Sequence, residues 1–239
     1  MIETHPLLQV ADVLSVALHG LEFLPPVACV YNPLEYAREC HRQYLEKFGN
    51  SPRKVILLGM NPGPWGMAQT GIPFGEVAVV REWLGIQAPV GRPVREHPRR
   101  PVEGLSCRRS EVSGRRLWGW ARDRFETPER FFARFFVANY CPLCFMEESG
   151  RNRTPDKLPM EVRQELLATC DQALRDTVAY LQPRLVVGVG HFAERRARLA
   201  LEGLPVRIGR MPHPSPASPQ ANRGWAEAAE AALRECGAL

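Results

Sequence analysis

The chain has 239 residues, of which 45% are hydrophobic and 24% are charged. This composition is that of an ordinary globular protein and excludes intrinsic disorder as its overall state. The formal net charge of +5 by itself supports nucleic-acid binding only weakly. The seven Cys residues are scattered and no apolar run approaches ~20 residues, so we expect neither a disulfide framework nor a membrane span.

The first part of the chain predicts helices around one buried strand. Apolar residues at helical spacing and good capping residues predict helices over residues 4–19, 33–48 and 76–84. The second of these should begin with Asn32 as its N-cap and Pro33 in its first turn, and should end at Gly49. The β-branched run 54–59 predicts a buried parallel strand, which a Pro/Gly-dense loop over residues 60–75 should follow.

The rest of the chain alternates between strands and helices. After a basic, irregular stretch, helices are predicted over residues 115–124, 128–134, 160–181, 191–201 and 222–236. Further strands are predicted over residues 135–138, 184–188 and 206–208, with loops over 139–159 and 211–221. This alternation predicts one α/β domain over residues 1–239, with three α/β/α layers and a central four-stranded parallel sheet. The helices of residues 1–50 should pack on it.

Ligands of such sheets bind outside the carboxyl ends of the strands, so the loops that begin there are the candidate site. The first of them, residues 59–77, holds five Gly and three Pro. It has neither the P-loop pattern nor the GxGxxG spacing. The polar side chain of Asn61, at the end of the strand, favours a ligand cradle over a merely rigid turn.

Two further residues at strand ends are candidates. Asn139 follows the strand at 135–138, and its amide both donates and accepts, which suits the edge of an imide base such as uracil. A turn-forming Asn is the alternative. His213 lies between two prolines, unlike the other histidines, which we interpret as surface or structural. Ser215 lacks the GxSxG context of a nucleophile.

The remaining motifs are weaker. Cys141 and Cys144 form a lone CxxC without a second pair, so a metal site is a minor alternative, and we expect no metal and no cofactor. The stretch from Asn152 to Thr154 matches a glycosylation sequon. The N-terminal sequence lacks the features of a signal peptide, however. We therefore expect an intracellular protein, in the cytoplasm or nucleoid of a bacterium or the nucleus of a eukaryote.

The loops at 59–77 and 213–225, GMNPGPWGMAQTGIPFGEV and HPSPASPQANRGW, resemble the signature motifs of the single-strand-selective monofunctional uracil-DNA glycosylases. These enzymes belong to the uracil-DNA glycosylase superfamily. The resemblance extends through PVEGLSCRRSEVSGRRLWGW, NYCPL, SGRNRTP and LVVGVG, over roughly residues 20–236. It implies a four-stranded α/β fold and hydrolysis of the N-glycosidic bond of uracil, and of 5-oxidised uracils such as 5-hydroxymethyluracil, in DNA. The strand itself would stay uncut.

The resemblance also implies roles for single residues. Asn61 would position the attacking water, His213 would stabilise the departing uracil anion, and Phe74 would stack on the flipped base. Asn139 would read the edge of the base, and backbone groups of Met60 and Gly63 would line the pocket.

Contacts to the DNA are expected from Ser215 and Arg223, the latter at the start of the last predicted helix, where a phosphate could bind. Vertebrate members carry an Arg wedge where this chain has Ala217 and Ser218, which weakens the case for an intercalating side chain here and so for activity on duplex DNA. We expect a monomer. A binding module without turnover and a metal-dependent nuclease built on Cys141 and Cys144 are the alternative functions.

Overall fold

The computed structural model describes residues 5–239, apart from the side chains of residues 219 and 220. Its core is a four-stranded parallel sheet in the order β3 (Phe135–Asn139), β2 (Val55–Gly59), β6 (Leu185–Val189) and β7 (Arg207–Met211). All five residues of β2 are buried, because the strand has neighbours on both sides and helices above and below. The predicted fold class is confirmed.

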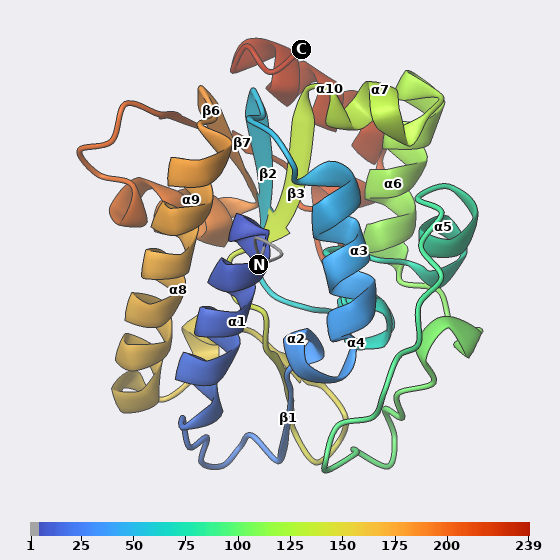
Figure 1. Ribbon diagram of the computed structural model, residues 1–239, viewed down its shortest axis with the longest axis vertical. Helices are drawn as coiled ribbons and strands as arrows, with labels where there is room; N and C mark the ends of the chain where they lie inside the picture. The colour runs from blue at the N-terminus through green and yellow to red at the C-terminus, as the bar shows by residue number, and fades with distance from the viewer. Residues whose placement is uncertain (1–4) are drawn as a thin grey trace.

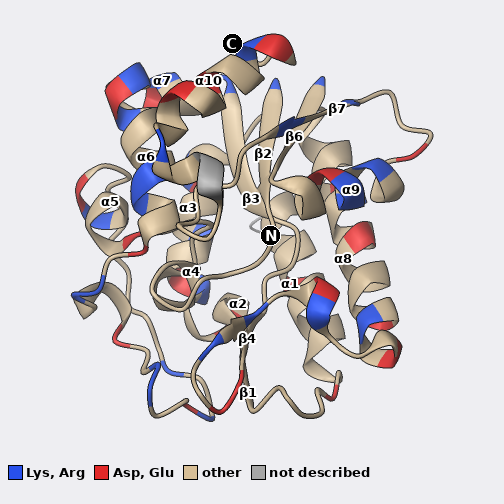
Figure 2. Cartoon of the chain, turned by 180° about the vertical axis from the view of Figure 1, so that it is seen from behind, with Lys and Arg blue, Asp and Glu red and all other residues tan. Residues whose placement is uncertain are grey.

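Helices cover both faces of this sheet. Figure 1 shows one face, which is covered by α1 (Pro6–His19), α3 (Arg38–Phe48) and α8 (Met160–Leu181). Figure 2 shows the other, which is covered by α6 (Val112–Phe125) and α10 (Trp225–Glu235). Three further helices are α5 (Val77–Glu82), α7 (Pro128–Phe132) and α9 (His191–Ala200), the last packed on β6. None of the helices described between residues 5 and 239 has the length and apolarity needed to cross a membrane.

The parallel register brings the chemistry-bearing loops to one edge. Gly59, the last residue of β2, pairs with Asn139, the last residue of β3. The loop that carries Asn61 therefore leaves the sheet beside Asn139. The chain leaves β7 at Met211, two residues before His213, at the same edge, because all four strands run in one direction.

A second, antiparallel sheet lies below this edge, in the order β1 (Cys29–Tyr31), β4 (Cys144–Met146) and β5 (Asn152–Arg153). The prediction of an uninterrupted loop over residues 139–159 is therefore wrong. Strands of two or three residues are too short to show a period of two, and β1 lies more than a hundred residues earlier in the chain than its partner β4. This sheet holds Asn152 in place beside the candidate site.

Two short helices also differ from the predictions. The helix expected over residues 33–48 is divided into α2 (Pro33–Tyr36) and α3 by Ala37, whose φ of −109° and ψ of 23° are not helical. The Pro/Gly-rich loop packs against the chain at this break. The contact is so close that a Cβ on Gly71 would lie 2.7 Å from the Ala37 carbonyl oxygen. That loop contains α4 (Met67–Thr70), which the sequence analysis interpreted as irregular.

The first and last predicted helices differ from the structure at their N-terminal ends or begin outside the described residues. Thr4, the expected start of the first helix, lies outside the described residues. The last helix begins at Trp225 and not at residue 222, because a 3₁₀ turn, η3 (Pro219–Asn222), and Gly224 in a left-handed conformation precede it. Arg223 thus lies in the turn before the helix, and its expected place in the first turn is wrong. Two further 3₁₀ turns are η1 (Gly104–Ser106) and η2 (Pro155–Lys157).

Candidate active site

A cavity of about 420 Å³ opens at the carboxyl edge of the parallel sheet. Segments far apart in the sequence line it, and they bring together nearly all residues singled out from the sequence: Met60, Asn61, Gly63, Phe74, Asn139, His213 and Ser215. Ala217 and Ser218 also line the cavity, whereas Arg223 is exposed and is not among its lining residues. We call this cavity the base pocket.

The amide of Asn61 is oriented by the protein. Its Nδ2 donates to the carbonyl oxygen of Leu143 over 3.2 Å. An amide fixed through its nitrogen presents its oxygen as an acceptor. Because Asn61 lines the base pocket, that oxygen is available to a water molecule or to a substrate hydrogen.

Asn139 lies closer to the sheet, and its partner is weaker. Its Nδ2 contacts the Met67 sulfur at 3.2 Å, and a thioether is a poor acceptor. Its Oδ1 lies over Gly59, where a Cβ would come within 2.3 Å of that oxygen. The donor and the acceptor of this amide therefore remain available to a ligand that offers a carbonyl oxygen and an N–H group.

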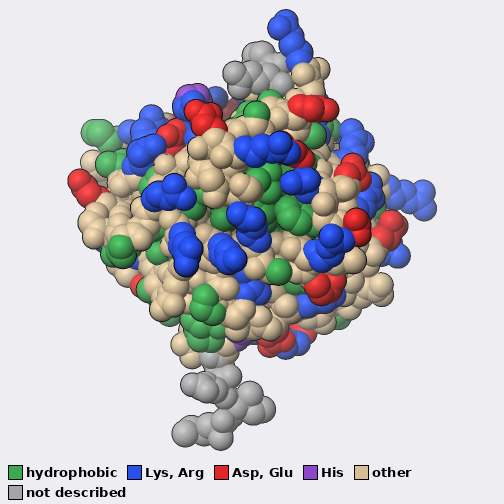
Figure 3. Space-filling view, turned by 90° about the horizontal axis from the view of Figure 1, so that it is seen from above, with side chains coloured by type: hydrophobic (Ala, Val, Ile, Leu, Met, Phe, Trp, Pro, Cys, Tyr) green, Lys and Arg blue, Asp and Glu red, His purple; other side chains and the backbone are tan. Residues whose placement is uncertain are grey.

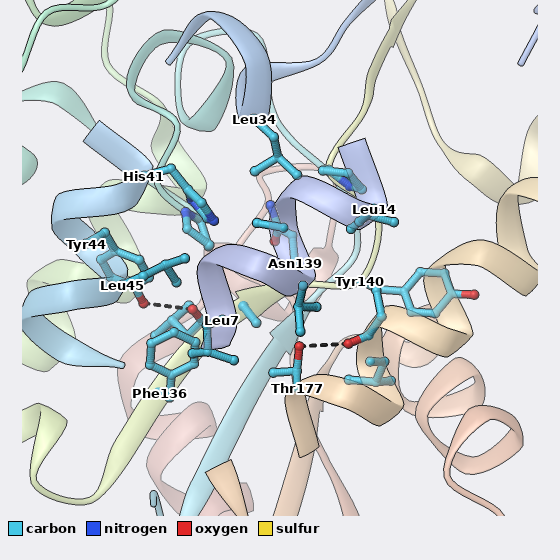
Figure 4. Close-up of a pocket in the computed structure, with 18 of the residues that line it drawn as sticks. Leu7, Leu14, Leu34, His41, Tyr44, Leu45, Phe136, Asn139, Tyr140 and Thr177 are labelled. Atoms are coloured by element: carbon cyan, nitrogen blue, oxygen red, sulfur yellow. Dashed lines mark hydrogen bonds between the residues drawn. The ribbon is translucent and has the colours of Figure 1, made fainter. Parts of the chain in front are cut away.

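Figure 4 shows what lies behind Asn139. A small cavity of about 80 Å³ separates α1 from the sheet, and it is lined mostly by apolar side chains such as Leu7, Leu14 and Leu34. His41 also lines it; burial lowers the pKa of His41 to about 4, and its Nδ1 lies 2.7 Å from the Gly71 carbonyl oxygen. Asn139 thus faces an apolar interior on one side and the base pocket on the other.

Phe74 is held in a strained backbone conformation. Its φ of 56° is in the left-handed region, which is uncommon for a bulky residue and costs of order 1–3 kcal/mol. Two glycines fix it: a Cβ on Gly59 would lie 2.6 Å from the ring, and a Cβ on Gly114 would lie 2.0 Å from the Phe74 carbonyl oxygen. The strain places an aromatic face in the base pocket, where a planar base can stack on it.

His213 is oriented by its own loop. The backbone N–H of Ser215 donates to His213 Nδ1 over 3.0 Å, so in the neutral ring the proton resides on Nε2. Burial lowers the pKa of His213 to about 4, which keeps the imidazole neutral near pH 7. Its ring lies 6.3 Å from that of Phe74, centroid to centroid. His213 is therefore a neutral hydrogen-bond donor beside the stacking surface.

Glu111 is a pocket residue that no sequence pattern indicated. Backbone N–H groups of Trp65 and Ser113 donate to its carboxylate, and burial raises its pKa. A Cβ on Gly63 would lie 2.3 Å from Glu111 Oε2, and one on Gly66 would lie 3.0 Å from its Cγ. Glu111 therefore supports the turn that carries Gly63, and only glycine leaves room for it.

Other lining residues were also missed. Ser113, Asn152 and Thr154 line the base pocket, and Asn152 Nδ2 donates to the Pro62 carbonyl oxygen over 3.1 Å. Arg116 donates to the Pro214 carbonyl oxygen over 2.8 Å and so holds the His213 loop from outside. The motifs SEVSGRR and SGRNRTP contain most of these residues, but nothing in their spacing distinguishes a pocket residue from a loop residue.

The cysteines of the CxxC motif turn to different neighbours. The thiol of Cys141 is hydrogen-bonded to that of Cys170, while Cys144 Sγ lies 3.7 Å from Asn152 Oδ1. Both side chains are buried. Across residues 5–239, no group of three or more His, Cys, Asp or Glu side chains is placed to hold a metal ion.

Comparison with known proteins gives the family of this chain. The model of the uracil DNA glycosylase superfamily matches residues 46–235. Single-strand selective monofunctional uracil DNA glycosylases from Mus musculus and Bos taurus are 54% identical to the chain over 228 residues, which are 95% of this chain and 82% and 84% of those proteins.

A solved structure shows the same fold. Pedobacter heparinus SMUG2 superposes with a TM-score of 0.62 at 17% identity, over 95% of this chain and 94% of that one. Because the family model covers most of the chain and the curated relatives match it nearly end to end, the chain belongs to the uracil-DNA glycosylase superfamily.

Proposed function

We propose that this protein hydrolyses the N-glycosidic bond of uracil in DNA and leaves an abasic site in an uncut strand. One observation carries the proposal: Asn61, Phe74, Asn139 and His213 line a single cavity although they come from three separate segments of the chain, two loops and the end of β3. The names of the curated relatives, single-strand selective monofunctional uracil DNA glycosylases, support it.

The base must first leave the helix stack to reach a pocket at the edge of the sheet. Phe74 then offers a stacking face. The amide of Asn139, whose one side-chain partner is the weakly accepting Met67 sulfur, presents one donor and one acceptor, which match the O4 and N3–H of uracil. Cytosine presents the opposite pattern, so binding it would leave buried polar groups unpaired at roughly 1–3 kcal/mol each.

His213 and Asn61 are the two residues that we propose act in bond cleavage. The glycosidic bond breaks through an oxocarbenium-like state, in which negative charge develops on the base. The Nε2–H of neutral His213 is the donor that stabilises this charge. Asn61 holds a water through its oxygen, but a neutral amide cannot take its proton. The water therefore gives its OH to C1′ of the sugar, and its proton passes through solvent to the uracil anion, which leaves as neutral uracil. The enzyme therefore relies mainly on stabilising the leaving base and on placing the water.

The proposal includes the absence of strand cleavage. A glycosylase that cuts the strand usually forms a Schiff base through an amine, and Lys is the usual source. Lys47, Lys54 and Lys157 are all exposed, and none belongs to the lining of the base pocket as the structure describes it. Lys47 Nζ instead donates to the Leu84 carbonyl oxygen over 2.7 Å.

Release of free uracil from a single-stranded oligonucleotide, with and without EDTA, tests the function. EDTA-resistant release supports the glycosylase. A mobility shift without product would indicate a binding module, and loss of activity with the chelator would indicate a metal enzyme. Borohydride trapping on the same strand should give no covalent adduct; an adduct that disappears in Lys157→Ala would contradict the monofunctional mechanism.

The finer features of the proposal are single-strand preference, action on 5-oxidised uracils such as 5-hydroxymethyluracil, and action as a monomer in an intracellular compartment. Ser215 and Arg223 stay proposed as DNA contacts. Ser215 N–H and Oγ are both engaged within the loop, with His213 and with the N–H of Ala217, so its contribution to DNA binding runs through the shape of that loop.

A further inference from the structure

One turn of the base pocket carries an aromatic side chain on its outer side. Pro64 and Gly66 line the pocket, whereas Trp65 between them does not and is half-buried at the surface. The backbone N–H of Trp65 donates to Glu111, which fixes the turn. Trp65 is therefore held just outside the mouth of the pocket.

Two guanidinium groups lie over the Trp65 ring. Arg109 Cζ lies 4.7 Å and Arg100 Cζ lies 5.1 Å from the ring centroid. Arg100 Nε also donates to the Gly150 carbonyl oxygen over 2.8 Å, so this side chain is anchored, while Arg109 is exposed. We call these three residues the Trp65 platform.

The charges of the Trp65 platform are not neutralised. Within the part of the chain that the structure describes, neither Arg100 nor Arg109 forms an ion pair with a carboxylate. The carboxylates of Glu96 and Glu147, in the neighbouring turns, are already paired with Arg92 and Arg153. An aromatic ring beside unneutralised Arg is the combination by which proteins bind single-stranded nucleic acid: the bases stack and the cations meet the phosphates.

Resting on the proposed function, we infer that the Trp65 platform binds an unpaired nucleotide of the DNA strand next to the uracil that enters the base pocket. Its base stacks on the layer formed by Trp65 and the Arg109 guanidinium, and its phosphate meets Arg100 or Arg109. A base in a duplex has its faces covered by its neighbours, so this contact is available in a single strand. The platform therefore contributes to single-strand preference.

Positive charge alone does not identify this surface. Figure 3 shows Lys and Arg side chains also gathered over the opposite edge of the sheet. Lys54, Arg134 and Arg184 immediately precede β2, β3 and β6 and therefore lie at the amino ends of these strands. Figure 2 shows blue segments, Lys or Arg, at the ends of the strands opposite the base pocket. No aromatic–guanidinium contact involves them in the described part of the chain. Arg184, which is exposed, supplies the matched control: its loss removes the same charge far from the base pocket.

The experiment measures the dissociation constant for two uracil-free single strands of equal length, one normal and one whose central nucleotides lack bases. Trp65→Ala should raise the Kd for the normal strand roughly tenfold and leave the Kd for the base-less strand within about twofold. Trp65→Phe, which keeps an aromatic face, should recover most of the loss. Arg184→Ala should change neither Kd by more than about twofold.

Equal losses on both strands in Trp65→Ala, or an effect of Arg184→Ala as large as that of Arg109→Ala, would overturn the inference. If Trp65→Ala does not fold, Arg109→Lys serves as the test variant. It keeps the positive charge but removes the planar guanidinium, so the Kd for the normal strand should rise while the Kd for the base-less strand stays unchanged. Because these strands contain no uracil, the result is independent of turnover. A wild-type protein that binds them in this way but releases no uracil would contradict the proposed function and leave the platform standing.

Discussion

The base pocket and the Trp65 platform share the turn from Gly63 to Gly66 but differ in charge and burial. No Lys or Arg belongs to the described lining of the base pocket. Burial lowers the pKa of His213 and raises the pKa of Glu111, and both shifts favour the neutral form of the side chain. The platform next to the pocket is cationic and lies at the surface, with Trp65 and Arg100 half-buried and Arg109 exposed. Bond cleavage therefore takes place among neutral groups in the base pocket, whereas strand binding uses positive charge at the surface. The two faces of one turn provide these two environments separately.

The largest expected effect tests the pocket side of this comparison. His213→Ala removes the donor that meets the developing charge on the base, and loss of such a donor typically lowers kcat about 10²- to 10³-fold. Binding of a uracil-free single strand should stay within about twofold, because that contact belongs to the other region. Single-turnover kinetics and fluorescence anisotropy measure the two quantities. A loss of binding as large as the loss of rate would show that the regions are not separable.

A smaller loss is expected at the water site. Asn61→Ala should lower kcat at least about tenfold, since the amide positions the attacking water but does not take its proton. Circular dichroism should stay as in the wild type, because the single hydrogen bond lost is to the Leu143 carbonyl oxygen. Kinetics like those of the wild type would remove Asn61 from the mechanism.

Selectivity between bases should depend on Asn139. Asn139→Ala should narrow the preference for uracil over cytosine by about five- to a hundredfold, which corresponds to roughly 1–3 kcal/mol of unpaired polar groups. Asn139→Asp should relax the preference or shift it toward cytosine. Excision from two otherwise identical single strands checks this. An Asn139→Ala variant as selective as the wild type would assign base reading to another group, such as the backbone at Met60 or Gly63.

The smallest effect concerns pH. Burial lowers the pKa of His213 from its ordinary value of 6.5 to about 4, so the ring is neutral in the free enzyme across about pH 5 to 8. A plot of kcat/KM against pH should therefore show no change that reflects titration of His213 in this range. A limb near pH 6.5 that disappears in His213→Gln would show that the pocket leaves this ring solvated.

The amino-acid sequence by itself determined the central fold. The runs that became β2 and β6 are apolar and β-branched, as strands covered on both faces must be, and α8 occupies the predicted span from Met160 to Leu181. The strand-end rule also indicated Asn61, Asn139 and His213 before any geometry was known, and the family resemblance of the loop motif at 59–77 added Phe74. Local pattern indicated the strands, α8 and the three strand-end residues because each lies in, or shortly after, an element that its own sequence specifies.

Tertiary structure decided the rest, because it depends on contacts between distant segments. The small sheet needs β1 to meet β4, and neither strand is long enough to show periodicity. Glu111 becomes a pocket residue only where Gly63 and Gly66 leave room for it, and the strained φ of Phe74 persists only between Gly59 and Gly114. Trp65 and Arg109 are forty-four residues apart in the chain, so their stacking, unlike the loop motifs, could be found only in the folded molecule.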